Sequence, residues 1–404
     1  MDGTLRVNLR LTKRAPGAFV ADSDYVAGGK KRGFCRLRFN DLPSEENMKT
    51  GLNSRFAALG CAMLLGGLAL DATPAAAQSA TPPANVGTGD CDRACLQGLA
   101  EQFIGALLAH DPGKAPLAKN VRYSENSVPL PIPDGFWKNA TGVRPYRLYI
   151  ADPEWGTIGF YARMYENGDP VIVSTRLRVY AHQITEIEIV VTTERWRTTP
   201  PGAPSAPTDY LGEKPRAEYL QVVPAAQRRS REELMKIVNT YFTGIENNTG
   251  DKPPLFSSHC QRLEDGRPTS NVPVQPGQER GGINMSCAED LALGYHRNDN
   301  RIRSRRIMAV DLEHQVVMTS VYFDHENDAP IRSYKLKNGK TVTVNDTGTS
   351  TLQAHETFSI DKEGISQVEA VFTNVTYGTR PYFSSGFHMD SPQAATDGFD
   401  EYQH

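Results

Sequence analysis

The sequence predicts an α+β protein made of two tandem copies of one domain. Residues 184–192 recur in similar form as residues 365–373, and residues 107–117 recur as residues 245–255. Each copy opens with a helical pattern and closes with strands rich in β-branched residues, which is an order typical of an α+β domain. Because solenoid repeats have periods of about 20 to 50 residues, the longer spacing here indicates two paired domains.

Each copy is expected to begin with an amphipathic helix. In the first copy, apolar residues recur at helical spacing between residues 96 and 108. The second copy repeats this pattern between residues 234 and 245, and Ser230 with Glu233 in front of it forms a capping box.

Strands follow the helix in both copies. The predicted strands are rich in β-branched and aromatic residues, and short turns join them as in antiparallel hairpins. They cover residues 158–166, 171–180 and 184–193 in the first copy and residues 315–325, 351–360 and 365–376 in the second.

The second copy is longer than the first. The spacing between matched positions grows from 138 residues at Lys114 and Lys252 to 181 residues at Ile184 and Ile365. The second copy therefore carries insertions, and we place them at residues 266–282 and 335–350, which are rich in loop-forming residues.

The first 80 residues are interpreted as a targeting segment with an upstream extension, and not as part of the fold. Positive charge at Lys49 and Arg55, an apolar run over residues 56–70 and small residues at 75–77 are typical of a secretory signal peptide. We assign residues 48–80 to this signal and residues 1–47, which show no sustained periodicity, to an extension from a mis-called start. The apolar run is shorter than the roughly 18 residues of a spanning helix. We therefore expect an exported, periplasmic or extracellular protein with no membrane segment after cleavage.

The other boundaries follow from composition. Residues 81–90 are a linker, and residues 91–197 form the first domain. The next linker, residues 198–227, holds four prolines between 198 and 207, which predicts an extended connection. Residues 228–385 form the second domain, and residues 386–404 are a tail that we expect to be flexible.

The charge balance excludes one class of partner. Cleavage after residue 77 removes 11 of 44 basic and 7 of 47 acidic residues, which leaves 33 against 40 and a net charge of −7. A nucleic-acid-binding protein needs a concentrated basic surface, so we expect no nucleic-acid partner.

Four cysteines remain after the predicted cleavage: Cys91, Cys95, Cys260 and Cys287. Export favours disulfides, and the simplest pairing joins Cys91 to Cys95 and Cys260 to Cys287, although four cysteines allow three connectivities. Their spacing is not that of a zinc site, so we expect no metal.

The element order resembles the cone-shaped fold of nuclear transport factor two, and in particular its SnoaL-like branch. The order is a helix, a short strand with a polar residue, a short helix, and long antiparallel strands that end at residues 184–192 or 365–373. More narrowly, residues 91–96 followed by residues 123–126 are similar to an uncharacterised family of exported proteins with tandem cone domains. The resemblance implies two tandem cones, each a curved antiparallel sheet packed on helices.

What the resemblance implies about function is a pocket between curved sheet and helices. Some relatives use it for lyase, isomerase or hydrolase chemistry on small, often cyclic substrates, and others only for binding. Sheets of this fold commonly pair as dimers, so two joined copies imply an intramolecular pseudo-dimer. We expected the apolar residues Ile187, Ile189 and Val191 of the last strand to form that contact.

The first copy offers a candidate ligand face. Strand alternation places Tyr161, Arg163 and Tyr165 on one face, and Arg176 follows on the next predicted strand. Such a face could line a polar pocket for an aromatic or acidic ligand, or it could be an ordinary solvated sheet face.

Two aromatic residues are further candidates for ligand binding. Tyr123 and Trp137 could stack on the ring of a ligand, or they could be aromatic residues of the core.

Two glutamates are present in both copies. Glu125 matches Glu264, and Glu188 matches Glu369. A carboxylate inside an apolar cone can act as general acid or base, or it can fix the structure by binding a neighbouring arginine. Retention in both copies favours the structural interpretation.

Other candidates are acidic or basic groups that occur in one copy. In SnoaL-like enzymes a carboxylate often lies near the end of the first helix, where this chain has Asp111 after His110; Asp111 before Pro112 is also an ordinary helix ending. In the second copy, His325 and His355 lie on predicted strands, where they could serve acid–base chemistry, bind a metal or be ordinary strand residues; no histidine spacing supports the metal.

The sequence thus predicts an exported protein that binds a small molecule, with lyase or isomerase chemistry if it is an enzyme. Glu125 or Asp111 would abstract a proton, while Tyr161, Arg163 or Arg176 would stabilise the developing negative charge, with Glu188 as a further ligand-binding candidate. No cofactor is expected, since the chain has no Gly-rich phosphate loop or nucleophile elbow. The alternative is a non-catalytic ligand-binding or assembly protein.

Overall fold

The structure is a computed structural model that describes residues 6–15, 18–27, 30–39, 90–193, 207–247, 255–273, 283–294, 296, 301–325, 332–344, 349–384 and 386–389. The chain divides into two compact units, Met1–Ser79 and Ala80–His404. The predicted signal peptide, part of the proline-rich linker and most of the tail lie outside the described residues.

The first unit contains a three-stranded antiparallel sheet in the order β1-β2-β3, from β1 (Arg6–Ala15), β2 (Ala18–Ala27) and β3 (Lys30–Phe39). Residues 1–47 are assigned no strands from the sequence. In β1, however, Val7, Leu9 and Leu11 alternate with polar residues, which is the period of a strand.

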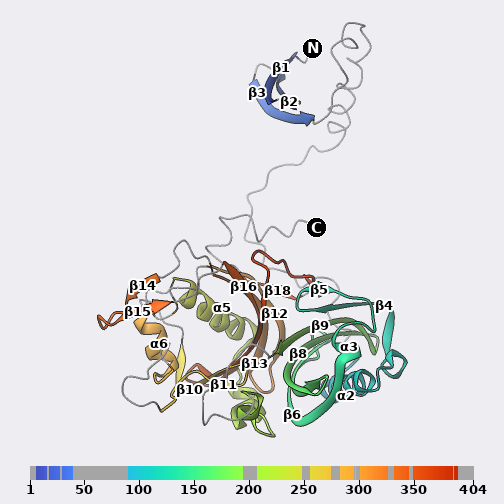
Figure 1. Cartoon of the computed structure of the whole chain (residues 1–404), viewed down its shortest axis with the longest axis vertical. Coiled ribbons are helices and arrows are strands. Elements are labelled where there is room, and N and C mark those ends of the chain that lie inside the picture. The colour runs from blue at the N-terminus through green and yellow to red at the C-terminus, as the bar shows by residue number, and fades with distance from the viewer. Residues whose placement is uncertain are drawn as a thin grey trace. The chain divides into compact units, whose positions relative to one another are not determined.

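The first of the two repeated domains opens with α2 (Arg93–Leu108), which begins where the Asp92 side chain accepts a hydrogen bond from the Cys95 N–H. Its sheet has the order β5-β4-β9-β8-β7-β6, and β4 is parallel to β9 whereas the other pairs are antiparallel (Figure 1). The strands are β4 (Leu117–Glu125), β5 (Val128–Pro129), β6 (Ala140–Asp152), β7 (Thr157–Glu166), β8 (Asp169–Tyr180) and β9 (Gln183–Thr193), with the short helix α3 (Phe136–Asn139) before β6.

The second domain repeats this arrangement around α5 (Arg231–Asn247). Its sheet has the order β11-β10-β17-β16-β13-β12-β18, and again the first long strand, β10, is parallel to the last, β17. The strands are β10 (Phe256–Glu264), β11 (Arg267–Pro268), β12 (Arg301–Asp311), β13 (Val316–His325), β16 (Ser350–Ile360), β17 (Ile365–Val375) and β18 (Phe387–His388).

The additional segments of the second domain include α6 (Cys287–Leu293) and a hairpin of β14 (Arg332–Lys335) and β15 (Thr341–Val344). The hairpin overlaps the predicted insertion at residues 335–350. The matching strand orders confirm an α+β protein with two domains, one on a six-stranded and one on a seven-stranded mixed sheet.

Both predicted disulfides are present, Cys91–Cys95 and Cys260–Cys287. Among the described residues, Cys91, Cys95 and His182 form a group with metal-ligand spacing, but the two sulfur atoms are joined to each other and are not thiolates. None of the described helices is long and apolar enough to cross a bilayer.

The two repeated domains contact each other through the outer faces of their sheets, where β9 lies against β17 and β6 against β12. The contact is apolar in part, with Tyr161 and Val190 of the first domain packed in one cluster with Met318 and Val371 of the second. A Cβ atom on Gly159 would lie 2.0 Å from the Met318 sulfur, so glycine permits this close approach.

Two arginine clamps cross the contact in opposite directions. Arg93, at the start of α2, binds Asp311 and, at 2.6 Å, Glu313 of the second domain. Arg231, at the start of α5, binds Asp152 at 2.8 Å and Glu154 at 2.9 Å in the first domain. The contact therefore has the reciprocal character of an isologous dimer interface.

The contact uses the opposite face of β9 from the one that we expected. Ile187, Ile189 and Val191 lie in the core of the first domain. Glu188, from the other face, reaches Arg306 of the second domain at 2.5 Å. The alternation of side chains along a strand shows that it has two faces, but not what packs on each. Here the polar face of β9 is buried against the second domain because its charged residues form ion pairs.

Between the domains, η4 (Pro207–Leu211), α4 (Ala217–Leu220) and η5 (Ala225–Gln227) give the end of the linker a defined path. Tyr219 of α4 is buried, and its hydroxyl donates to the Thr357 carbonyl at 3.2 Å. The end of the linker thus packs on β16 of the second domain.

Candidate functional site

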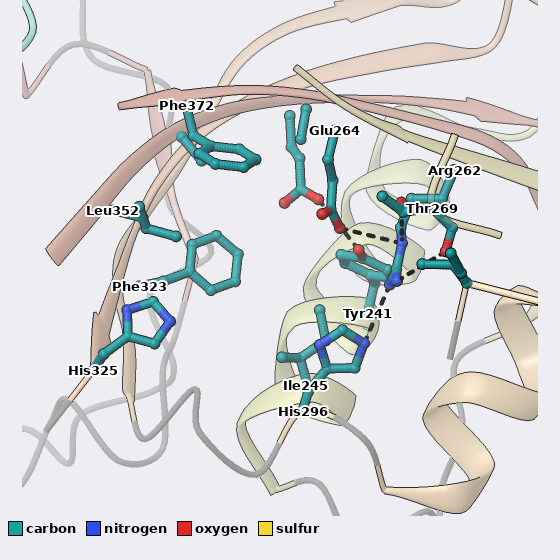
Figure 2. Close-up of a pocket in the computed structure, with 14 residues that line it drawn as sticks. Tyr241, Ile245, Arg262, Glu264, Thr269, His296, Phe323, His325, Leu352 and Phe372 are labelled. Carbon is teal, nitrogen blue, oxygen red and sulfur yellow. Dashed lines mark hydrogen bonds and ion pairs between the residues drawn. The ribbon is translucent and has the colours of Figure 1, made fainter. Parts of the chain in front are cut away.

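The second domain contains a cavity of about 390 Å³ between α5 and the inner face of its sheet. One part of its wall is apolar, with Ile245, Ile283, Phe323, Leu352, Ala354, Ala370 and Phe372. The rest is polar, with Tyr241, Arg262, Glu264, Thr269, His296, His325 and Glu356. Figure 2 shows Phe323, Leu352 and Phe372 across the open space from Glu264 and Arg262. The size suits a small organic ligand.

Glu356 lies on the apolar inner face of β16. Its strand neighbour His355 faces the first domain, with Nδ1 2.9 Å from the Ser174 hydroxyl. Because strand side chains alternate, Glu356 points the other way, on the same face as Ala354 and Phe358 of the core. Burying a carboxyl on this face costs free energy of folding unless hydrogen bonds or a counter-charge compensate it.

The environment of Glu356 keeps its carboxyl neutral. The Tyr241 hydroxyl donates to Oε1 at 3.2 Å, whereas Oε2 has no hydrogen-bond partner among the described residues. Burial raises the pKa of Glu356 to about 8, and the nearby Glu264 charge acts in the same direction. The carboxyl is therefore mostly protonated at neutral pH.

Arg262 organises the polar end of the cavity. Its Nε lies 3.1 Å from the Thr269 hydroxyl and 3.4 Å from Glu264 Oε1. Its Nη2 lies 3.0 Å from Asp290 Oδ2, and its Nη1 lies 3.2 Å from His296 Nε2 (Figure 2).

Asp290 also binds the imidazole, since His296 Nε2 lies 2.8 Å from the same carboxylate oxygen. Burial acts to raise the pKa of Asp290, but His296 and Arg262 outweigh it and hold the pKa below its usual value. Asp290 is thus an anion that orients two cavity side chains.

The position of Asp290 is fixed by α6. This helix begins with a capping box in which Ser286 accepts from the Glu289 N–H and the Glu289 side chain accepts from the Ser286 N–H. The Cys260–Cys287 disulfide ties the first turn of α6 to β10, two residues before Arg262. The Cys260–Cys287 disulfide, which is predicted from the sequence, therefore holds α6, and with it Asp290, close to β10.

The corresponding positions of the first domain hold different side chains. The cross-strand pair Thr319 and Glu356 has its counterpart in Phe160 and Thr175. Phe160 packs with Phe103, whose ring lies 5.3 Å from that of Trp137. The first domain therefore has an aromatic ring and an uncharged residue where the second domain has a threonine and the Glu356 carboxyl.

Two predicted site residues, Glu125 and Tyr123, hold α3 in place. Glu125 accepts from the Tyr123 hydroxyl at 2.7 Å and from the Phe136 N–H, at the start of α3, at 2.6 Å. Burial raises the pKa of Glu125, and these two donors act against that shift. Trp137 of α3 is fully buried in the core, and Tyr123 is almost so.

The predicted ligand face of the first domain is the contact face. Tyr161 is fully buried, and its hydroxyl donates to the His355 carbonyl at 2.6 Å and the Glu369 carbonyl at 3.1 Å. Arg163 donates to the Gly212 carbonyl of the linker at 2.6 Å. The Tyr165 hydroxyl accepts from Arg144 at 3.1 Å.

Arg176 and Glu188 form part of a buried charge cluster at this contact. Arg176 binds Glu186 at 2.7 Å and Glu188 at 2.9 Å. Burial would raise the pKa of Glu188, but Arg306 and Arg176 hold it well below its usual value. Its counterpart Glu369 accepts from Tyr146 of the first domain at 2.8 Å. Both retained glutamates of the last strand thus bind the opposite domain.

The remaining candidates are separated. Asp111 is exposed and caps a short turn by accepting from the Gly113 N–H at 3.0 Å, while His110 Nδ1 lies 2.7 Å from the Trp137 carbonyl. His355 lies in the contact between the domains, whereas His325 and Glu264 line the cavity.

Sequence reasoning missed five residues of this site: Tyr241, Arg262, Asp290, His296 and Glu356. A signal was available for Glu356, because residues 352, 354, 356 and 358 are Leu, Ala, Glu and Phe, an apolar face with one acid. No local pattern marks Asp290 and His296, which come from the inserted region around α6.

Residues 227–372 match a protein family described as a domain of unknown function, DUF8021. The match covers most of the second domain, ends within β17 at Phe372, and includes every residue that lines the cavity. No curated protein matches the chain.

Proposed function

We propose that the second domain binds a small, partly apolar molecule in its cavity and transfers a proton at that molecule through Glu356. The reaction class would be that of a cofactor-independent lyase or isomerase, in which a proton leaves one atom of the substrate and another atom receives one.

The observation that carries this proposal is the placement of Glu356. Its carboxyl lies on an otherwise apolar strand face. One oxygen accepts a hydrogen bond from Tyr241, and the other has no partner among the described residues, so a ligand in the cavity could bind it. With a pKa of about 8, Glu356 can give or take a proton near neutral pH without a large change in driving force.

A second group could complete the proton transfer. His296 lines the same cavity, and Asp290 holds its imidazole at 2.8 Å. A carboxylate that orients an imidazole also stabilises its protonated form. Glu356 and His296 together would supply an acid and a base.

The fold and the disulfides are consistent with the wider proposal. In both domains the first long strand is parallel to the last, with a helix over the inner face, which supports two domains resembling nuclear transport factor two and its SnoaL-like branch. Two disulfides support an exported location. The first domain, which has Thr175 where the second has Glu356, would serve as the structural half of the pseudo-dimer.

The test is hydrogen–deuterium exchange at carbon in two aromatic carbon acids, phenylacetone and phenacylamine (2-amino-1-phenylethanone). Proton NMR in D₂O would follow the loss of the acidic C–H signal. We expect the protein to accelerate exchange of at least one compound over buffer, and Glu356→Gln to reduce that acceleration roughly a hundredfold or more.

Glu369→Gln is the matched control, because Glu369 is also a buried glutamate but lies in the contact between the domains. Exchange in Glu356→Gln at the rate of Glu369→Gln would refute proton transfer at Glu356. Saturation-transfer NMR on the same samples reports binding separately. Binding without exchange would favour the alternative, a non-catalytic ligand-binding protein.

A further inference from the structure

We infer that the ligand of the second-domain cavity is a small organic cation, an amine joined to a ring or another apolar group. This inference rests on the proposed function in that it concerns the same cavity, and it adds the charge of the ligand, which proton transfer alone does not determine.

The first argument is the balance of charge at the polar end of the cavity. Two acids, Glu264 and Glu356, line it, and a third, Asp290, binds Arg262 at 3.0 Å. Arg262 already directs its nitrogens at protein groups: Nε at Thr269 and Glu264, Nη2 at Asp290 and Nη1 at His296. An anionic ligand would meet carboxylates and an arginine that is already engaged, whereas a cation would meet complementary charge.

The second argument is the geometry of the two lining acids. Oε2 of Glu356 is buried without a partner among the described residues, and the Glu264 side chain is 34% exposed. The Glu264 charge helps to keep the Glu356 carboxyl protonated. A primary ammonium has three donors in a compact group, so it can bind the Glu356 carboxylate that forms and offset the repulsion from Glu264.

The third argument is the aromatic character of the wall. Tyr241 lies beside the acids, and Phe323 and Phe372 face them across the cavity (Figure 2). Aromatic faces attract cations that lie within about 6 Å of the ring centroid, so Tyr241, whose hydroxyl binds Glu356 at 3.2 Å, adds to the attraction at the acidic end. The apolar part of the ligand would pack on Phe323, Phe372 and Leu352.

Binding of a cation has a consequence for protons. Before binding, Glu356 carries a proton at neutral pH, because its pKa is about 8. When the ammonium enters, the carboxyl ionises, its proton goes to solvent, and an ammonium–carboxylate pair forms. One ammonium and one carboxylic acid thus become one ion pair and one released proton, so that charge and atoms balance.

The experiment compares three probes that share a ring and differ in charge at pH 7: benzylamine, benzyl alcohol and benzoate. Isothermal titration in phosphate and in Tris measures affinity, and the difference in heat between the two buffers gives the protons released. We expect benzylamine to bind roughly tenfold more tightly than benzyl alcohol, and benzoate to bind most weakly. We expect about one proton released per benzylamine.

Two variants locate the effect. Glu356→Gln should abolish the proton release and weaken benzylamine roughly tenfold while leaving benzyl alcohol nearly unchanged. Glu264→Gln should weaken benzylamine as well, and it serves as the second variant should the first not fold. Glu369→Gln, outside the cavity, should bind all three probes as the wild type does.

The outcomes separate this inference from the proposed function. Benzoate or benzyl alcohol binding as tightly as benzylamine, or benzylamine binding without proton release, overturns the cationic ligand and leaves proton transfer at Glu356 standing. Failure of all three ring compounds to bind counts against both.

Discussion

Replacing Glu356 by glutamine tests the buried carboxyl through the pH dependence of stability. Burial raises its pKa from the ordinary value of 4.5 to about 8 in the folded protein. Between these values the folded state holds a proton that the unfolded state has lost. The contribution of this group to stability is therefore fully present below about pH 4.5 and is lost as the pH rises through 8.

The magnitude follows from one proton. Each pH unit in this window costs about 1.4 kcal/mol of the free energy of unfolding, so from pH 5 to pH 8 the wild type should lose on the order of 4 kcal/mol relative to Glu356→Gln. Other titrating groups, such as His355, are present in both proteins and cancel in the difference.

Urea unfolding at five pH values from pH 5 to about pH 9, followed by circular dichroism, measures that difference. We expect the wild type to lose stability relative to the variant at each step and the difference to level off above about pH 8. A difference that stays constant from pH 5 to pH 8 would refute the raised pKa. Glu369→Gln offers an internal comparison, because burial raises the pKa of Glu369 only to about 7, so its difference should level off earlier.

Three further substitutions probe separate parts of the molecule. Tyr241→Phe removes a donor to the Glu356 carboxyl, so the pKa of Glu356 should rise above about 8, which carbon-13 NMR of labelled glutamate would detect. Arg231→Met leaves Asp152, whose side chain is 0% exposed, without its clamp, and should cost about 3 kcal/mol in urea unfolding; adding Asp152→Asn should restore part of that loss. Gly135→Ala forces a φ of +63° on an alanine and brings a methyl carbon to 2.3 Å from the carboxylate oxygen that accepts the first N–H of α3, so thermal unfolding should show a loss of about 1–3 kcal/mol.

The elements of the two domains could be predicted because their signals are local. Apolar spacing marks α2 and α5, β-branched runs mark β7 to β9 and β16 to β17, and the repeated last strand reveals the duplication. The disulfides follow from where the cysteines fall in each copy. The strands of the first unit were missed because their alternation is short and interrupted by glycines and proline.

The partners of each sheet face could not be predicted. Tyr161, Arg163 and Arg176 have the composition of a solvated or ligand-binding face, yet Arg176 is 1% exposed. Its neutralising partners Glu186 and Glu188 come from the adjacent strand. A buried face whose charges are paired across strands has the same composition as a face in contact with water.

The candidate site was missed for a related reason. Comparison of the copies gave weight to what they share, whereas the cavity depends on where they differ: Thr319 in place of Phe160, and Glu356 in place of Thr175. Arg262 comes from β10, and Asp290 and His296 come from the region around α6, so that only the folded chain brings the three together.

The crossed clamps of Arg93 and Arg231 bear on how such a protein can diverge. Each domain carries both halves of a clamp, an arginine at the start of its helix and acids at the turn after its first long antiparallel strand, so each could in principle meet a copy of itself. In a dimer of identical chains every substitution occurs on both sides of the axis. Joining the two halves in one chain removes that constraint. Each half is then free to change on its own, and here the second has Thr319 and Glu356 where the first has Phe160 and Thr175, a difference that identical subunits cannot have.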